Sequence, residues 1–179
     1  KPSFRRLTRR PAYVIHEVAR GEREQLGRGT GRLIRLTNMV TIPLVALMSL
    51  QSVPIIRLLY ERGAFGPEAT QASAAALTIY SFGLPGQVLV QILSRAHYAM
   101  QDTLRPQVIA VIQVALNVLC NLALIGPLGY RGIAVANVLA FWGAAVLLLW
   151  SLFRRLGRLD LEFGAQARIV ASTAVMSVA

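Results

Sequence analysis

The chain has 179 residues, of which 55% are hydrophobic and only 15% are charged, and its formal net charge is +11. Its mean hydropathy is +0.52. Soluble domains are usually less apolar and carry about a quarter charged residues, so this composition excludes an ordinary soluble domain and predicts an integral membrane protein.

Residues 1–32 are predicted to form a basic cytoplasmic segment. We expect a short helix over residues 12–26, interrupted by a glycine cluster at 27–31 that acts as a flexible basic loop near anionic headgroups. The first span, residues 33–53, contains Pro43, which predicts a kink near Val40.

A short amphipathic helix is predicted to follow the first span. Pro54 is suited to open it, and Gly63 to end it. Gly66, Pro67 and Glu68 then form a helix start, with a proline and an acid in the first turn.

The second span, residues 69–100, contains GLPG at 83–86, which predicts a break near its middle. Asp102 or Thr103 is suited to cap the helix that follows. The polar residues of this span fall on one stripe at helical spacing, namely Tyr80, Gln87, Gln91, Ser94, Arg95 and Tyr98.

The third span, residues 106–125, is twenty residues without a charge. A helix of that length crosses the roughly 30 Å of hydrocarbon in a bilayer. Gln113, Asn117 and Asn121 form a polar stripe, which we expect to face other helices or a wet cavity because amides in hydrocarbon need partners. A turn is predicted at 126–129.

The fourth span, residues 132–153, has Asn137 as its strongly polar residue and ends at a cluster of arginines. A fifth span begins near residue 165 and is cut off at 179. The predicted fold class is all-α, a polytopic transmembrane helical bundle over residues 33–179 with four complete spans and a truncated fifth. We expect the chain to be a piece of a longer protein.

The distribution of charge predicts the orientation. One side of the membrane receives sixteen of the nineteen Lys and Arg residues, most of them in residues 1–35. The other side receives only Arg57, Arg62 and Arg131. The positive-inside rule therefore places residues 1–32 in the cytoplasm. Because the arginines flank apolar runs, we do not expect nucleic acid as a partner.

Three motifs in order resemble a known family. They are IIRLLYERGAF at Ile55–Phe65, LPGQVLVQILSRAHYAMQDTLRP at Leu84–Pro106, and GPLG with GIAVAN between Gly126 and Asn137. Together they resemble the MurJ/MviN family of lipid II flippases, within the multidrug/oligosaccharidyl-lipid/polysaccharide exporter superfamily. The resemblance covers about Ala19 to Ala179. It implies the C-terminal half of a longer chain, whose missing N-terminal half would complete the cavity.

The resemblance implies a possible sodium ion as ligand, with no other cofactor. The residues that would hold it are Asn117, Asn121 and Asn137, with the backbone carbonyl of Ile133; amide and carbonyl oxygens suit a hard cation. The alternative is that these asparagines only form hydrogen bonds between helices.

Gln87, Gln91 and Arg95 are the candidate lining of the substrate cavity. Arginine suits a diphosphate because its planar fork bonds two oxygens at once. The alternative is that Arg95 lies near the cytoplasmic end and snorkels to the interface. Catalysis has little support: His16 and His97 are isolated, no metal-ligand spacing is present, and a helix cap explains Asp102.

We therefore expect part of a flippase that moves an undecaprenyl-linked peptidoglycan precursor across the bacterial inner membrane by alternating access, in contact with membrane lipid. GLPG and Pro43 are the expected bending points. The alternatives are another polysaccharide-lipid or drug exporter of the same superfamily, a membrane-embedded enzyme acting on lipid-linked sugars, or a non-transporting helical partner in a wall-synthesis complex.

Overall fold

The computed structural model describes residues 10–63, 65–156 and 173. Over these residues the chain forms helices joined by short turns, without strands. The helices are α1 (Arg10–Leu50), α2 (Ser52–Tyr60), α3 (Pro67–Ser81), α4 (Leu84–Ala99), α5 (Leu104–Leu128) and α6 (Tyr130–Leu156).

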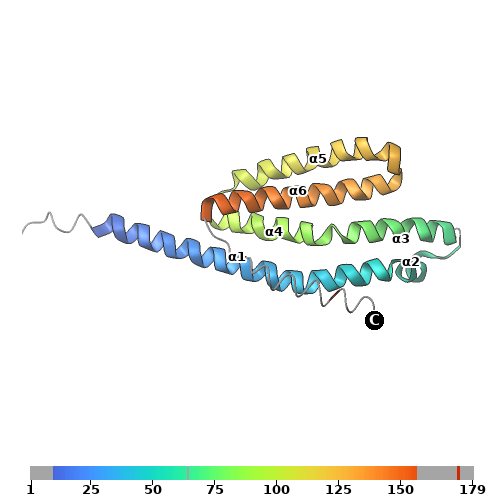
Figure 1. The fold of residues 1–179 in the computed structure, drawn as a ribbon, viewed down its shortest axis with the longest axis horizontal. Coiled ribbons are helices and arrows are strands. Elements are labelled where there is room, and N and C mark those ends of the chain that lie inside the picture. Colours follow the sequence, from blue (N-terminus) through green and yellow to red (C-terminus); the bar gives the residue numbers. More distant parts are fainter. Residues whose placement is uncertain (1–9, 64, 157–172, 174–179) are drawn as a thin grey trace, which may run out of the picture.

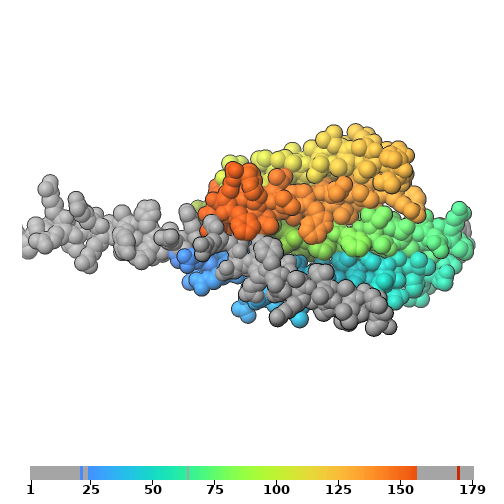
Figure 2. Space-filling view, viewed as in Figure 1, coloured from blue at the N-terminus to red at the C-terminus, as the bar shows by residue number. Residues whose placement is uncertain are grey.

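The long helices lie side by side in layers (Figure 1). α3 and α4 follow one another along one line, with α1 packed on one side of them and α6 on the other. α5 forms the outermost layer and packs mainly against α6. The space-filling view shows the same order, from the blue and cyan of α1 to the yellow of α5 (Figure 2).

Within the described residues, four helical stretches are long and apolar enough to cross a membrane. They are Glu24–Leu50, Pro67–Ala99, Leu104–Leu128 and Tyr130–Leu156. The spans predicted at 33–53, 69–100, 106–125 and 132–153 correspond to these four stretches in order, although the first stretch begins earlier than predicted and ends at Leu50. The break predicted at GLPG separates α3 from α4. The predicted fifth span lies outside the described residues except for Thr173.

Small side chains on α6 form the centre of the bundle. Its buried positions include five alanines, which allow the neighbouring helices to approach closely. In contrast, the apolar window of α5 has no buried residue, and its outer face exposes valines and leucines such as Val111 and Leu122. An exposed apolar face of that length is what a lipid-facing helix requires.

The predicted interruption at residues 27–31 is wrong, because α1 continues through this cluster and crosses the boundary at 32/33 without a break. Gly27, Thr30 and Gly31 are buried and lie on one face of the helix. A glycine inside a helix costs only about 1 kcal/mol relative to alanine. Small residues on a packed face offset this cost by permitting close contact.

The turn predicted at 126–129 also begins later than expected. α5 continues through Pro127 to Leu128, and only Gly129, with φ of 55°, leaves the helical conformation. A proline in the last turn removes a single backbone hydrogen bond, which the helix tolerates. Glycine adopts the left-handed region readily, so Gly129 supplies the end of the helix.

The short helix after the first span is confirmed, although it begins at Ser52, two residues before Pro54, and ends at Tyr60, before the predicted end at Gly63. Gly66 precedes α3 and Pro67 is its first residue, as predicted. α1 remains a single helix through Pro43. The predicted cap of α5 is divided between two residues: Thr103 holds the capping position, while Asp102 Oδ1 accepts a weak bond of 3.4 Å from the backbone N–H of Arg105.

Candidate functional site

A cavity of about 490 Å³ lies between α1 and α4. Gln91 and Arg95 line it from α4, and Gln25 and Thr30 line it from α1. Gln87, one helical turn before Gln91, is exposed, as Gln91 and Arg95 are, but it is not among the lining residues. Among the described residues, no carboxylate lies within ion-pair distance of Arg95. The structure thus brings two of the three predicted cavity residues together and leaves the guanidinium without an acidic partner there.

The predicted polar stripe of α5 is half-buried, whereas neighbouring Val114 and Val118 are exposed. Asn121 Nδ2 donates to Asn117 Oδ1 at 3.0 Å. Asn121 Oδ1 is buried and accepts no hydrogen bond from any described residue. An orphaned buried oxygen is costly, which makes it a candidate ligand atom.

Asn137 and Ile133 lie one turn apart on α6, the helix that packs against α5. Asn137 is half-buried and Ile133 is exposed. No hydrogen bond joins Asn137 to Asn117 or Asn121 in the described part of the chain. The structure therefore places the four predicted residues on two packed helices, and among them a hydrogen bond joins only the α5 pair.

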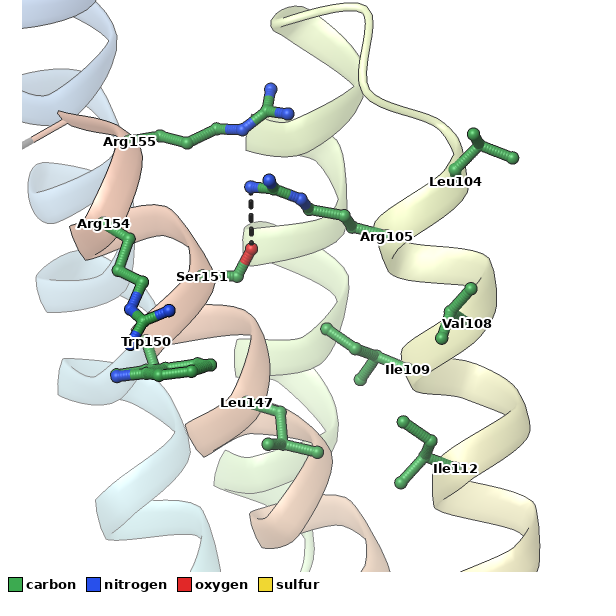
Figure 3. A pocket seen from close by; sticks show the side chains of 10 residues that line it. All are labelled: Leu104, Arg105, Val108, Ile109, Ile112, Leu147, Trp150, Ser151, Arg154 and Arg155. Carbon is green, nitrogen blue, oxygen red and sulfur yellow. Dashed lines mark hydrogen bonds between the residues drawn. The ribbon is translucent and has the colours of Figure 1, made fainter.

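A polar network at the basic end of the bundle was not predicted. We define this end as the one where α4 ends, α5 begins and α6 ends (Figure 1). His97 is fully buried there. Its Nδ1–H donates to the backbone carbonyl of Leu93 at 2.8 Å, and its Nε2 lies 3.1 Å from Ser151 Oγ. Arg105 donates to the same Ser151 oxygen at 3.4 Å (Figure 3).

These contacts define the roles of the groups. The Leu93 carbonyl can only accept, so His97 carries a proton on Nδ1. Ser151 Oγ accepts from Arg105 and also lies within hydrogen-bond distance of His97 Nε2, so both ring nitrogens of His97 have partners. The network therefore positions helices and does not present a free base.

Asp102 completes this network in the turn between α4 and α5. Its Oδ2 lies 3.2 Å from Arg155 and 3.5 Å from Arg105, as ionic contacts rather than aligned hydrogen bonds. Its backbone N–H donates to the His97 carbonyl at 3.0 Å. The carboxylate, whose side chain is 9% exposed, therefore joins the turn to the end of α6.

Sequence reasoning identified Asp102 only as a helix cap and His97 as isolated. The partners that give both residues their role lie on α6: Ser151, which is 54 residues from His97, and Arg155, which contacts Asp102. Charge clustering near span ends was the only available signal. Among the described residues, no three His, Cys, Asp or Glu side chains come together as a metal site.

The break between α3 and α4 is closed by a tryptophan from α6. Trp142 Nε1–H donates to the Phe82 carbonyl at 3.0 Å. A Cβ added to Gly83 would lie 3.1 Å from the Tyr80 carbonyl oxygen, and one added to Gly86 would lie 3.4 Å from the Trp142 ring. Irregular backbone at membrane depth is tolerated only where protein or water satisfies it, and α6 provides that partner.

Several known proteins are similar to this chain. A protein of Rhizobium meliloti (strain 1021) described as a probable lipid II flippase MurJ is 37% identical over 146 residues, which are 79% of this chain and 27% of that protein. The protein of the same description from Rhizobium tropici is 36% identical over 170 residues, 91% of this chain and 32% of that protein. The chain thus spans about a third of the length of these relatives.

A solved structure described as lipid II flippase MurJ in an inward closed conformation superposes with a TM-score of 0.78 at 24% sequence identity. The match covers 89% of this chain and 33% of that one, and it establishes the fold of this segment. The model of the family described as lipid II flippase MurJ matches residues 15–179. With four apolar helices of membrane-spanning length among its described residues, the chain therefore belongs to the lipid II flippase MurJ family and is a multi-pass membrane protein.

Proposed function

We propose that the chain forms part of a lipid II flippase, which moves an undecaprenyl-linked peptidoglycan precursor across the bacterial inner membrane by alternating access. The observation that carries this proposal beyond family membership is the cavity between α1 and α4, where Arg95 has no described acidic partner. A guanidinium free of a carboxylate suits a diphosphate, to which it donates two parallel hydrogen bonds. Gln91 adds an amide that suits sugar or phosphate oxygens.

The proposed orientation places the basic end of the bundle and residues 1–32 in the cytoplasm. Arg95, Arg105 and the arginines that end α6 lie at this end. α2, which carries Arg57 and precedes Arg62, and the α5–α6 turn, next to Arg131, lie at the other end (Figure 1). The positive-inside rule supports this assignment. In this orientation the cavity between α1 and α4 lies nearest to the cytoplasmic leaflet, from which the precursor would be moved.

We also propose a sodium site at Asn117, Asn121 and Asn137 with the Ile133 carbonyl. The buried and unpaired Asn121 Oδ1 supports it, since a hard cation prefers oxygen ligands. These four groups are neutral, so any carboxylate ligand would come from the rest of the protein. When bound, the ion would supply positive charge that holds α5 and α6 together.

A sodium titration tests this site in the full-length protein. We expect sodium, but not choline, to raise the midpoint of thermal unfolding in the wild type, and Asn121→Ala to abolish the rise. Gln113→Ala is the matched control on the same stripe and should retain it. A sodium effect that survives Asn121→Ala would contradict the site.

The flippase proposal is tested by the accessibility of lipid II headgroups in vesicles that contain the full-length protein. We expect Arg95→Ala to lower translocation about tenfold or more, because hydrogen bonds to a charged group contribute about 1.5–3 kcal/mol. Arg131→Ala, at the opposite end, is the matched control and should leave the rate unchanged. Equal rates in both variants would contradict the role of Arg95, and chemically altered precursor in the vesicles would favour the enzyme alternative.

A further inference from the structure

A second cavity, of about 470 Å³, lies between α5 and α6 at the basic end. Arg105, Arg154 and Arg155 line its mouth, and Val108, Ile112 and Leu147 line its deeper part (Figure 3). It is separate from the cavity between α1 and α4, with which it shares no lining residue. Neither the sequence motifs nor the proposed transport of the precursor assigns a role to it.

The cavity mouth has an excess of positive charge. Figure 3 shows Arg105 and Arg155 extending toward each other across the gap between α5 and α6. Asp102 lies within 3.5 Å of both and compensates one charge. Arg154 has no described carboxylate; its guanidinium carbon lies 3.8 Å from the centre of the Trp150 ring, which holds it in place. Three guanidinium groups against one carboxylate leave two positive charges that an anion would compensate.

The deeper part of the cavity determines the kind of anion. Ile112 is seven residues beyond Arg105 on α5, so the apolar wall extends for about 10 Å along the helix axis at about 1.5 Å per residue. A free phosphate would leave this wall without a partner, whereas an amphiphile with an anionic head and a hydrocarbon tail would cover both parts. A volume of about 470 Å³ holds one headgroup and the first part of one chain.

We propose that this cavity binds one anionic phospholipid of the cytoplasmic leaflet, with its phosphate between Arg105, Arg154 and Arg155 and one acyl chain along Val108, Ile112 and Leu147. The choice of leaflet rests on the orientation proposed above; the site itself does not depend on precursor transport. Arginines that only snorkelled to the interface would be spread around the helix ends. Here all three line one apolar cavity at the basic end, where the positive-inside rule places the anionic headgroups of the cytoplasmic leaflet.

Lipid binding to the delipidated full-length protein tests the proposal, measured by native mass spectrometry with phosphatidylglycerol, phosphatidylcholine and inorganic phosphate as probes. We expect the wild type to bind one phosphatidylglycerol in preference to phosphatidylcholine. Arg105→Gln with Arg154→Gln should weaken this binding by about a hundredfold, since each removes a charge-assisted contact that contributes about tenfold or more. The matched control is Arg62→Gln with Arg131→Gln, at the opposite end.

A second pair of variants keeps every charge and tests the apolar wall. Ile112→Trp fills the wall of the cavity, and Val111→Trp places the same side chain on the adjacent exposed position, which does not line it. We expect Ile112→Trp to weaken phosphatidylglycerol binding about tenfold and Val111→Trp to leave it unchanged. This pair decides the matter if the arginine variants fail to fold.

Three outcomes would overturn the proposal. The first is that the wild type binds phosphatidylcholine as tightly as phosphatidylglycerol. The second is that Ile112→Trp binds phosphatidylglycerol as tightly as Val111→Trp does. The third is that an excess of a competitor, either inorganic phosphate or lipid II, displaces the phosphatidylglycerol. Because the readout is lipid binding, loss of translocation in Arg95→Ala neither supports nor contradicts this site, and the two proposals fail independently.

Discussion

Replacing Gly132 with alanine is expected to separate α5 from α6. An added Cβ would clash with the backbone carbonyl oxygen of Leu124 and would lie 2.7 Å from its carbonyl carbon. Ordinary contact begins near 3.4 Å, and the obstacle is main chain that no rotamer change can move. The helices must therefore shift by several tenths of an ångström along an interface filled with alanines, where overpacking costs typically about 1–3 kcal/mol. We expect a loss of about 3 kcal/mol, at the upper end of this range.

The assay is thermal unfolding of the full-length protein in detergent, with Gly29→Ala as the matched control. A Cβ at Gly29 would meet no atom within 4 Å, and the position is helical and exposed. There alanine should stabilise by about 0.5–1 kcal/mol, because it lowers the conformational entropy lost by the helix. Opposite signs of the two shifts would confirm the close approach of α5 and α6. A Gly132→Ala variant as stable as the wild type would refute it.

Three further substitutions are measured by the same unfolding assay. Trp142→Phe leaves the Phe82 carbonyl unpaired in the break and should cost about 1–2 kcal/mol; an unchanged midpoint would mean that water replaces the indole. Ser151→Ala removes the partner of His97 Nε2 and should lower the stability by about 1–3 kcal/mol. A variant as stable as the wild type would disprove this role of Ser151. Asp102→Asn should lower stability and reduce its dependence on salt, because the two facing arginines lose their shared counter-charge; an unaltered salt dependence would contradict this role.

Local residue chemistry predicted much of the fold. Pro67 begins α3 after Gly66, and GLPG separates α3 from α4, because proline and glycine restrict their own backbone whatever surrounds them. The same reasoning failed at Gly27 and Gly31. There the cost of a glycine within a helix is small. Whether the helix continues is decided by the packing of its buried face against neighbours that the sequence does not identify.

The candidate sites were predicted only in part, for the same reason. Gln91 and Arg95 lie one turn apart, so helical spacing predicts that they share a face. Helical spacing does not predict which residues of α1 lie opposite them. The contact of Asn117 with Asn121 is likewise within one helix. His97 and Asp102 depend on Ser151 and on the end of α6, and no local rule connects segments so far apart in the chain.

The indole on α6 that closes the α3–α4 break limits how this segment can change shape. Rotation at Gly83 would move the Phe82 carbonyl away from Trp142 and leave that carbonyl without a hydrogen-bond donor in the membrane. Although GLPG was an expected bending point, α3, α4 and α6 should instead travel as one rigid unit. The alternating access proposed above would then require this unit to slide along α1 or against the rest of the full-length protein.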